Sequence, residues 1–306
     1  MKIRCLIGAV LIGISAAWAQ QNREEHVEIN ATTRQYLIHV PPHYSTQQKY
    51  PLVMIFHGGG GNNKQIQQYM GMDAIADREG FITVYPQGLN KQWNDGREFK
   101  PEISHNDDVE FVKAMLQKLQ QQYSIDTQRV FATGISNGGF FSIYLSYKLN
   151  EQLLAVAPVC ASIPQRIFDE FWPKQPISVL LINGTQDPLV PYEGGEVGNR
   201  LTGSRGRCTS TEQTVERYRA INQTNQAPLV ENIPNRTNAD GCTAVSYTYH
   251  NNQNHTTIKL LKVINGGHTL PGGRPYLPKI IIGNVCDDFD GNETIWQFFK
   301  ECVVRL

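Results

Sequence analysis

Charged residues are few in this sequence, and neither sign is in excess. Of its 306 residues 18% are charged, with 28 lysines and arginines against 28 aspartates and glutamates. A chain without a basic or acidic excess has no strong electrostatic attraction to nucleic acid or to an anionic membrane surface. We therefore expect no nucleic-acid partner and no stable membrane insertion.

Cysteine is scarce as well, and no two cysteines have the C-x-x-C spacing typical of structural zinc sites. We therefore expect no metal site. Without Cys5, which lies in the leader described next, the cysteines are odd in number, so at least one thiol is unpaired within the monomer. Disulfide pairing is open from sequence. The cysteines concerned are Cys160, Cys208, Cys242, Cys286 and Cys302.

A long apolar run occurs only at the start of the chain. Lys2 and Arg4 precede the apolar stretch Cys5–Ala16, and Ala17-Trp18-Ala19 then forms an A-x-A pattern. This order is typical of a secretory signal peptide, and a transmembrane anchor needs about 20 apolar residues. We expect residues 1–19 to be cleaved near Ala19, which leaves 26 basic and 28 acidic residues. The protein is then secreted, to the periplasm or to the medium.

Short apolar strands alternate with helical patterns along the rest of the chain. Pro51–Phe56 and Ser178–Ile182 are continuous apolar runs typical of strands buried on both faces, and Asp107–Tyr123 has helical spacing. This alternation predicts an α/β fold with a mostly parallel central sheet and helices on both faces. The other predicted strands are Thr33–Val40, Phe81–Tyr85, Val130–Gly134, Leu154–Val159 and Thr257–Ile264, and the other predicted helices are Ile66–Arg78, Gly138–Leu149, Thr211–Ile221 and Asn292–Val303.

The length, and one continuous alternation of strands and helices, favour one catalytic domain over residues 20–306. A segment from about 190 to 256 interrupts this alternation, because it is rich in Gly, Asn, Arg and Thr. We expect this segment to elaborate the sheet rather than to form a separate domain. The polar cluster Asn251–Asn254 is typical of a hairpin or loop tip.

The strongest chemical signal is Gly134-Ile135-Ser136-Asn137-Gly138-Gly139, between a predicted strand and a predicted helix. This is the context of the G-x-S-x-G nucleophile elbow, in which small residues let strand and helix pack around a strained turn. We expect Ser136 to be the nucleophile of an α/β-hydrolase fold. The alternative is a small-residue turn without chemistry.

A serine hydroxyl needs a base, and in this fold the partners follow in the order Ser, acid, His. Asp187 and His268 each follow a predicted strand, so both belong at the sheet edge that carries Ser136. We expect His268 to act as general base and Asp187 to orient it; a loop-capping aspartate and a surface histidine are the alternatives. The other histidines fit the role of base less well. The order along the chain is wrong for those that precede the serine, and two others flank the polar tip: His26, His39 and His105, and His250 and His255.

The run His57-Gly58-Gly59-Gly60-Gly61-Asn62 follows another buried strand. Glycines let the backbone approach a substrate closely and direct N–H groups at a developing oxyanion. We expect one donor from Gly59, or less so Gly58, and the other from Asn137. A phosphate-binding loop is the alternative, but the run lacks G-K-[ST] and G-x-G-x-x-G. Because this chemistry needs only protein groups, we expect no cofactor.

Taken together, these motifs resemble the polyhydroxybutyrate depolymerase family of esterases, which includes feruloyl and acetylxylan esterases and LpqC-like proteins. The resemblance runs from about Arg34 to Phe299, and it also rests on Asp107-Asp108-Val109, Asp187-Pro188-Leu189-Val190-Pro191-Tyr192, Gly266-Gly267-His268-Thr269-Leu270-Pro271-Gly272 and Asp288-Phe289-Asp290. It implies the same triad, a substrate-entrance role for Trp93, and an acyl-pocket position for Leu270, where many relatives carry Trp. The alternative for Trp93 is a loop aromatic that packs on the core.

The sequence therefore predicts a secreted serine carboxylic-ester hydrolase that works through an acyl-enzyme. Because no polymer-binding module is visible, we expect soluble or oligomeric substrates: feruloyl or acetyl carbohydrate esters, short acyl esters or 3-hydroxybutyrate esters. The alternatives are a peptidase of the same fold and a catalytically dead secreted binding protein. Acyl specificity and oligomeric state are open.

Overall fold

The structure is a computed structural model, and it describes residues 22–97, 103, 105–170, 172–173, 175–199 and 203–304. The predicted signal peptide lies outside these residues. The strands are β1 (Asn22–Ile29), β2 (Thr32–His39), β3 (Tyr50–Phe56), β4 (Ile82–Pro86), β5 (Ile125–Ile135), β6 (Ala155–Val159), β7 (Ser178–Gly184), β8 (Gly195–Asn199), β9 (Gly203–Cys208), β10 (Leu229–Ile233), β11 (Thr243–Asn251) and β12 (Thr256–Ile264).

The helices are fewer, and several match the predicted ranges closely. They are α1 (Asn63–Met70), α2 (Met72–Glu79), the 3-10 turn η1 (Leu89–Lys91), α4 (Asp108–Gln122), α5 (Asn137–Lys148), α6 (Gln165–Glu170), α7 (Thr211–Ile221), α8 (Lys279–Ile282) and α9 (Gly291–Val304). Among the residues described, no helix is both long and apolar enough to cross a membrane.

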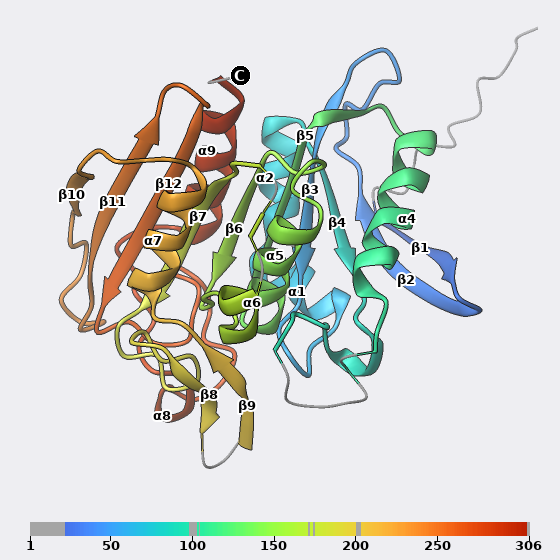
Figure 1. The fold of residues 1–306 in the computed structure, drawn as a ribbon. Helices are drawn as coiled ribbons and strands as arrows, with labels where there is room; N and C mark the ends of the chain where they lie inside the picture. Colours follow the sequence, from blue (N-terminus) through green and yellow to red (C-terminus); the bar gives the residue numbers. More distant parts are fainter. Residues whose placement is uncertain are drawn as a thin grey trace, which may run out of the picture.

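A single ten-stranded sheet organises the described chain, in the order β1-β2-β4-β3-β5-β6-β7-β12-β11-β10 (Figure 1). Strands from β4 to β12 in this order pair in parallel, and antiparallel pairs extend the sheet at both ends. The carboxyl ends of the parallel strands therefore meet at one edge, where Figure 1 also shows α8 and the small β8–β9 ribbon. The prediction of a mostly parallel sheet is confirmed.

Helices cover both faces of the sheet, as the alternation of strand side chains requires. In β3, Leu52, Met54 and Phe56 join the apolar core beneath α4, α5 and α7, whereas Val53 and Ile55 join the core beneath α1, α2 and α9. Successive strand residues point to opposite faces, so a strand that is apolar throughout feeds both layers. Figure 1 shows the two helix layers on either side of the sheet.

Two departures from the predicted elements have clear physical causes. The expected helix Ile66–Arg78 is two helices, because Gly71 takes φ 60°, ψ 22° and ends α1 before α2 begins. β1 was not predicted, since only every second residue is half-buried and the others are polar and exposed. The segment near 190–256 contains α7, the separate β8–β9 ribbon, and the antiparallel strands β11 and β10, of which β10 is the edge of the main sheet. The polar cluster after Tyr249 is the β11–β12 hairpin tip.

A buried ion pair fixes the loop that follows β4. Arg34 Nη2 lies 2.6 Å from Asp108 Oδ1, and the two side chains are 2% and 0% exposed. The other carboxylate oxygen of Asp108 accepts a hydrogen bond from the backbone N–H of Asn94 at 2.7 Å. Burial raises the pKa of Asp108, and the charge of Arg34 opposes that effect. The pair thus joins β2, α4 and the loop around Trp93.

We expect Asp108→Ala to lower the free energy of unfolding by about 3–5 kcal/mol, because it leaves the Arg34 charge buried without a partner. Urea denaturation followed by circular dichroism measures the change. Glu110→Ala is the control, since it removes the exposed Glu110–Lys113 pair of the same helix and should cost at most about 1 kcal/mol. Equal losses in the two variants would contradict a stabilising role for the buried pair.

Candidate active site

Ser136 lies on a strained turn between β5 and α5. Its backbone has φ 56° and ψ −123°, a combination rare for any residue but glycine, and its N–H donates to the Val159 carbonyl at 2.9 Å. The turn is possible because Gly138 has no side chain: a Cβ there would lie 2.1 Å from the Phe56 carbonyl oxygen. The sequence Gly-x-Ser-x-Gly therefore forms a nucleophile-elbow geometry at the carboxyl edge of the sheet.

Asp187 and His268 form a buried pair at the same edge. His268 Nδ1 lies 2.6 Å from Asp187 Oδ2, and the side chains are 1% and 2% exposed. Asp187 Oδ1 accepts hydrogen bonds from the backbone N–H groups of Leu189 and Val190, both at 2.8 Å. The carboxylate is thus held by three donors, and it fixes the imidazole with Nδ1 as the protonated nitrogen.

Four neighbouring strands each deliver one residue to this edge. Ser136 follows β5, Cys160 follows β6, Asp187 follows β7 and His268 follows β12, and these strands are adjacent in the sheet. The Cys160 sulfur, a carboxylate oxygen of Asp187 and a ring nitrogen of His268 all lie within 4.8 Å of one another. Cys160 was not among the predicted site residues; its φ of 51° marks the same kind of tight turn as Ser136.

His268 Nε2 has no hydrogen-bond partner among the described residues, Ser136 Oγ included. Catalytic hydrogen bonds are often long in free enzymes and shorten when substrate is bound. The free nitrogen is the one that a general base must direct at the nucleophile, since Nδ1 is occupied by Asp187.

The glycine run after β3 leaves two amide groups available beside Ser136. Gly60 donates to the Lys91 carbonyl at 2.8 Å and Gly61 to the Gly58 carbonyl at 3.0 Å. In the part of the chain described, the N–H groups of Gly58, Gly59 and Asn137 donate to no protein acceptor. Gly58 packs against the elbow, since a Cβ on it would lie 3.6 Å from Ser136 Cβ. These free donors are what an oxyanion hole requires.

His57 shapes this glycine loop from inside the protein. Its Nδ1 lies 2.8 Å from the Gly58 carbonyl oxygen, and its Nε2 accepts the N–H of Gly88 at 3.0 Å. Burial lowers the pKa of His57 to about 4, so the ring is neutral near pH 7. A neutral ring donates through one nitrogen and accepts through the other, as both contacts need. These contacts give His57 a structural role in the loop.

The side chain of Asn137 connects the elbow to the loop after β4. Its Oδ1 accepts the N–H of Trp93 at 2.9 Å, and its Nδ2 donates to the Trp93 carbonyl and to Asp95 Oδ2, at 3.1 and 2.6 Å. Asp95 in turn pairs with Arg97 at 2.6 Å, and both are buried. The Arg97 guanidinium lies 3.9 Å from the centre of the Phe140 ring.

Two residues predicted to contact substrate are fully buried. Trp93 stacks on Phe141 with ring centres 5.0 Å apart and donates its Nε1–H to the His57 carbonyl at 2.9 Å. Leu270 is also 0% exposed, and its N–H donates to the Tyr69 hydroxyl at 3.1 Å. Trp93 thus packs on the core, as its alternative interpretation describes, and substrate contact by either residue stays a prediction.

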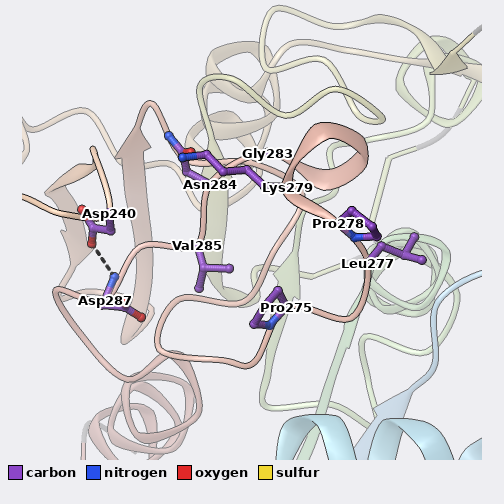
Figure 2. Close-up of a pocket in the computed structure, with 9 residues that line it drawn as sticks. All are labelled: Asp240, Pro275, Leu277, Pro278, Lys279, Gly283, Asn284, Val285 and Asp287. Atoms are coloured by element: carbon purple, nitrogen blue, oxygen red, sulfur yellow. Dashed lines mark hydrogen bonds between the residues drawn. The ribbon is translucent and has the colours of Figure 1, made fainter.

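A separate pocket of about 310 Å³ lies beside the histidine loop (Figure 2). It is formed mainly by the segment 275–287 and closed on one side by Asp240, whose carboxylate accepts the N–H of Asp287 at 2.8 Å. One residue of its lining contacts the loop that carries His268: the Asn284 carbonyl accepts a hydrogen bond from the N–H of Gly267 at 2.9 Å. It is lined by neither Ser136 nor His268.

Cys160, Cys208, Cys242 and Cys286 are buried free thiols, and Cys302 is buried as well.

The lowered pKa of His57 has a consequence for stability. The pKa of His57 is 6.5 in the unfolded chain and about 4 in the folded protein. Between these two pH values, the unfolded state therefore binds more protons than the folded state does. Stability therefore falls as the pH drops through this window, by about 3 kcal/mol from this residue, and levels off below it. We expect His57→Gln to remove this part of the pH dependence in urea titrations, whereas His43→Gln, at an exposed histidine, keeps it. Identical slopes for wild type and H57Q would refute the assignment.

Comparison with known proteins gives the family. Residues 43–218, more than half of the chain, match the phospholipase/carboxylesterase family. The putative esterase NocK of Nocardia uniformis subsp. tsuyamanensis is 29% identical over 266 residues, which cover 83% of this chain and 76% of that protein. Feruloyl esterase C of Emericella nidulans is 28% identical over 186 residues, which cover 58% of this chain and 64% of that protein.

A solved structure extends the likeness of fold to nearly the whole chain. The acetyl xylan esterase from Aspergillus awamori superposes with a TM-score of 0.61 over 91% of this chain and 99% of that one, at 12% sequence identity. The predicted α/β-hydrolase fold and the resemblance to feruloyl and acetylxylan esterases are confirmed, while the likeness to polyhydroxybutyrate depolymerases stays a prediction. The chain belongs to the phospholipase/carboxylesterase family of α/β hydrolases, and it is a carboxylic-ester hydrolase.

Proposed function

We propose that this protein is an exported serine esterase that cleaves soluble or oligomeric esters through a covalent acyl-enzyme. The observation that carries the proposal is the buried His268–Asp187 pair at 2.6 Å, on the sheet edge where Ser136 occupies its strained turn. Asp187 also holds the loop amides of Leu189 and Val190, but that task does not need His268 at its second oxygen, so the pairing with the imidazole favours a catalytic role.

In the acylation half, Ser136 Oγ attacks the ester carbonyl carbon while His268 Nε2 takes the hydroxyl proton. Asp187 stabilises the resulting imidazolium and does not itself take the proton. The intermediate collapses when His268 returns the proton to the leaving oxygen, so the C–O bond of the ester breaks and the alcohol departs. The acyl group stays on Ser136 as an ester.

In the deacylation half, water replaces the alcohol and the same groups work in reverse. His268 takes a proton from the attacking water, and the second tetrahedral intermediate releases the carboxylic acid as the proton returns to Ser136 Oγ. In both halves the former carbonyl oxygen carries negative charge in the tetrahedral intermediate. It accepts hydrogen bonds from the free N–H of Gly59, or of its neighbour Gly58, and from that of Asn137. Each such donor lowers the barrier by about 3 kcal/mol.

The relatives' names support carbohydrate esters as one substrate class. Feruloyl and acetyl esters of sugars, short acyl esters and 3-hydroxybutyrate esters all present an unhindered carbonyl to the elbow. A panel of these esters, assayed by product release, ranks the acyl groups. Activity on peptide amides instead would favour a peptidase, and a site that fails to label with a fluorophosphonate would favour a binding protein.

We expect Ser136→Ala to lower kcat by about a millionfold on p-nitrophenyl acetate, since nucleophile loss removes the acyl-enzyme route. Asp187→Asn should cost about ten-thousandfold, because the histidine then lacks its orienting acceptor. A fluorophosphonate probe followed by peptide mass spectrometry should label Ser136.

The control is Ser45→Ala, which removes a hydroxyl from an exposed loop residue and should keep full activity and labelling. Undiminished hydrolysis by S136A would end the proposal.

Export is a second part of the proposal, and it rests on the predicted leader. We expect the chain produced with its own first 19 residues in a Gram-negative host to reach the periplasm or the medium with Gln20 as its first residue. Amino-terminal sequencing of the exported protein measures this. Ala19→Arg should block cleavage, and a wild-type protein that retains Met1 would show that no leader is removed.

A further inference from the structure

An arginine from outside the main sheet lies over the glycine loop of the candidate site. Arg205 belongs to β9, in the two-stranded ribbon of β8 and β9 at the carboxyl edge of the sheet (Figure 1). A Cβ placed on Gly59 would lie 3.1 Å from Arg205 Nη1. The guanidinium is therefore within contact distance of the backbone to which we assign the oxyanion.

The ribbon contains a bulge at this residue. Glu196 pairs with Arg207 and Gly198 pairs with Ser204, so Arg205 and Gly206 together oppose the single residue Val197. Gly206 has φ 83°, which suits the extra residue of a bulge. Bulges turn side chains away from the regular alternation, and they are common beside active sites. Here the bulge is at the residue whose side chain reaches the glycine loop.

The guanidinium of Arg205 is half-buried and carries an unbalanced charge. Neither an ion pair nor a hydrogen bond joins it to any residue in the described part of the chain. Its neighbour Arg97 is already neutralised by Asp95. Burial, and after it the charge of Arg97, lower the pKa of Arg205, although an arginine remains protonated. A cation in this position is stabilised by any anion that enters the site.

Gln92 offers a second unused polar group at the same place. A Cβ on Gly59 would lie 2.9 Å from Gln92 Oε1, and this oxygen is buried without a hydrogen-bond partner in the described structure. Buried polar atoms are nearly always satisfied, so a lone acceptor beside a lone cation indicates that a ligand completes both. The two groups face the glycine loop from different elements, the loop after η1 and the ribbon.

We propose that Arg205 is a substrate-recognition residue that binds a carboxylate carried by the ester, with Gln92 accepting a neighbouring hydroxyl or amide hydrogen of the same substrate. The preferred substrates are thus acidic esters, such as the monoester of a dicarboxylic acid or the acylated form of an acidic alcohol. This inference rests on the proposed function, because it assigns specificity to the Ser136 site. The bidentate fork of arginine suits a carboxylate better than lysine does.

The test compares matched carboxylate and carboxamide esters. For an acid on the acyl side, the pair is monoethyl adipate and ethyl adipamate; for an acid on the alcohol side, it is 3-acetoxybenzoate and 3-acetoxybenzamide. In at least one pair we expect kcat/KM of the wild type to favour the carboxylate about tenfold or more, as a charge-assisted hydrogen bond allows. The pair that shows the preference tells which half of the ester carries the acid. Raising the salt concentration should reduce this preference.

Arg205→Gln should lower the carboxylate-to-carboxamide ratio by about 10- to 100-fold, and Arg205→Lys should retain part of it. Arg207→Gln is the matched control: it removes the same charge from an exposed position of the same strand, and should keep the ratio within about twofold. Circular dichroism confirms that each variant is folded. If R205Q does not fold, competitive inhibition of wild-type carboxamide-ester turnover by adipate, weakened by salt, gives the second readout.

The outcomes separate the two proposals. Ser136-dependent hydrolysis with no carboxylate preference in either pair, or with equal effects of R205Q and R207Q, overturns the role of Arg205 and leaves the esterase proposal standing. Hydrolysis that persists in S136A overturns the esterase mechanism itself.

Discussion

The carboxamide of Asn137 is the contact on which the geometry of the site depends. Through three hydrogen bonds it ties the first turn of α5 to Trp93 and Asp95, and so fixes the helix that follows Ser136 to the loop after β4. The same loop is held from its other side, because Asp108 accepts the N–H of Asn94. Side-chain networks of this kind are strong only when every member is satisfied, since the low dielectric of the interior makes an unpaired group costly.

The backbone of Asn137 and its side chain therefore have separate tasks. The side chain is buried and bonded to the loop after β4, whereas the free N–H is the donor that we propose for the oxyanion. A donor is effective in catalysis when it is already oriented before charge develops, so that no binding energy is lost in rearrangement. The neutral ring of His57 has a similar bracing role for the glycine loop, through its contacts with the Gly58 carbonyl and the Gly88 N–H.

Much of the fold followed from the sequence, because buried parallel strands are continuous apolar runs and their partner helices have regular spacing. The candidate triad residues were also visible, since order along the chain and position after a strand are local signals. The edge strands were harder to predict: β1 and β10 bury little of their surface, so their sequences carry almost no apolar pattern. Cys160 shared one local signal with Asp187, its position after a strand, but no motif marked it; Arg205 had no local signal, because it reaches the site only through the packing of the β8–β9 ribbon.

Trp93 shows what a resemblance leaves open. The resemblance implied an entrance position, with packing on the core as the alternative, and the ring is fully buried between Phe56, His57 and Phe141. A loop residue can belong to the core when the loop folds back over the sheet edge, and the sequence gives no measure of that. The resemblance of motifs predicted the order of the candidate triad residues along the chain. It did not predict how exposed the neighbouring side chains are.

The three-fold anchoring of Asp187 has one further consequence. Because the amides of Leu189 and Val190 hold one carboxylate oxygen independently of the histidine, the group keeps its orientation whether the imidazole is neutral or charged. In the proposed mechanism, the charge that moves between serine and histidine thus meets a stationary counter-charge. The reorganisation energy that a freely rotating carboxylate would add to each proposed proton transfer is removed when the chain folds, before any substrate arrives.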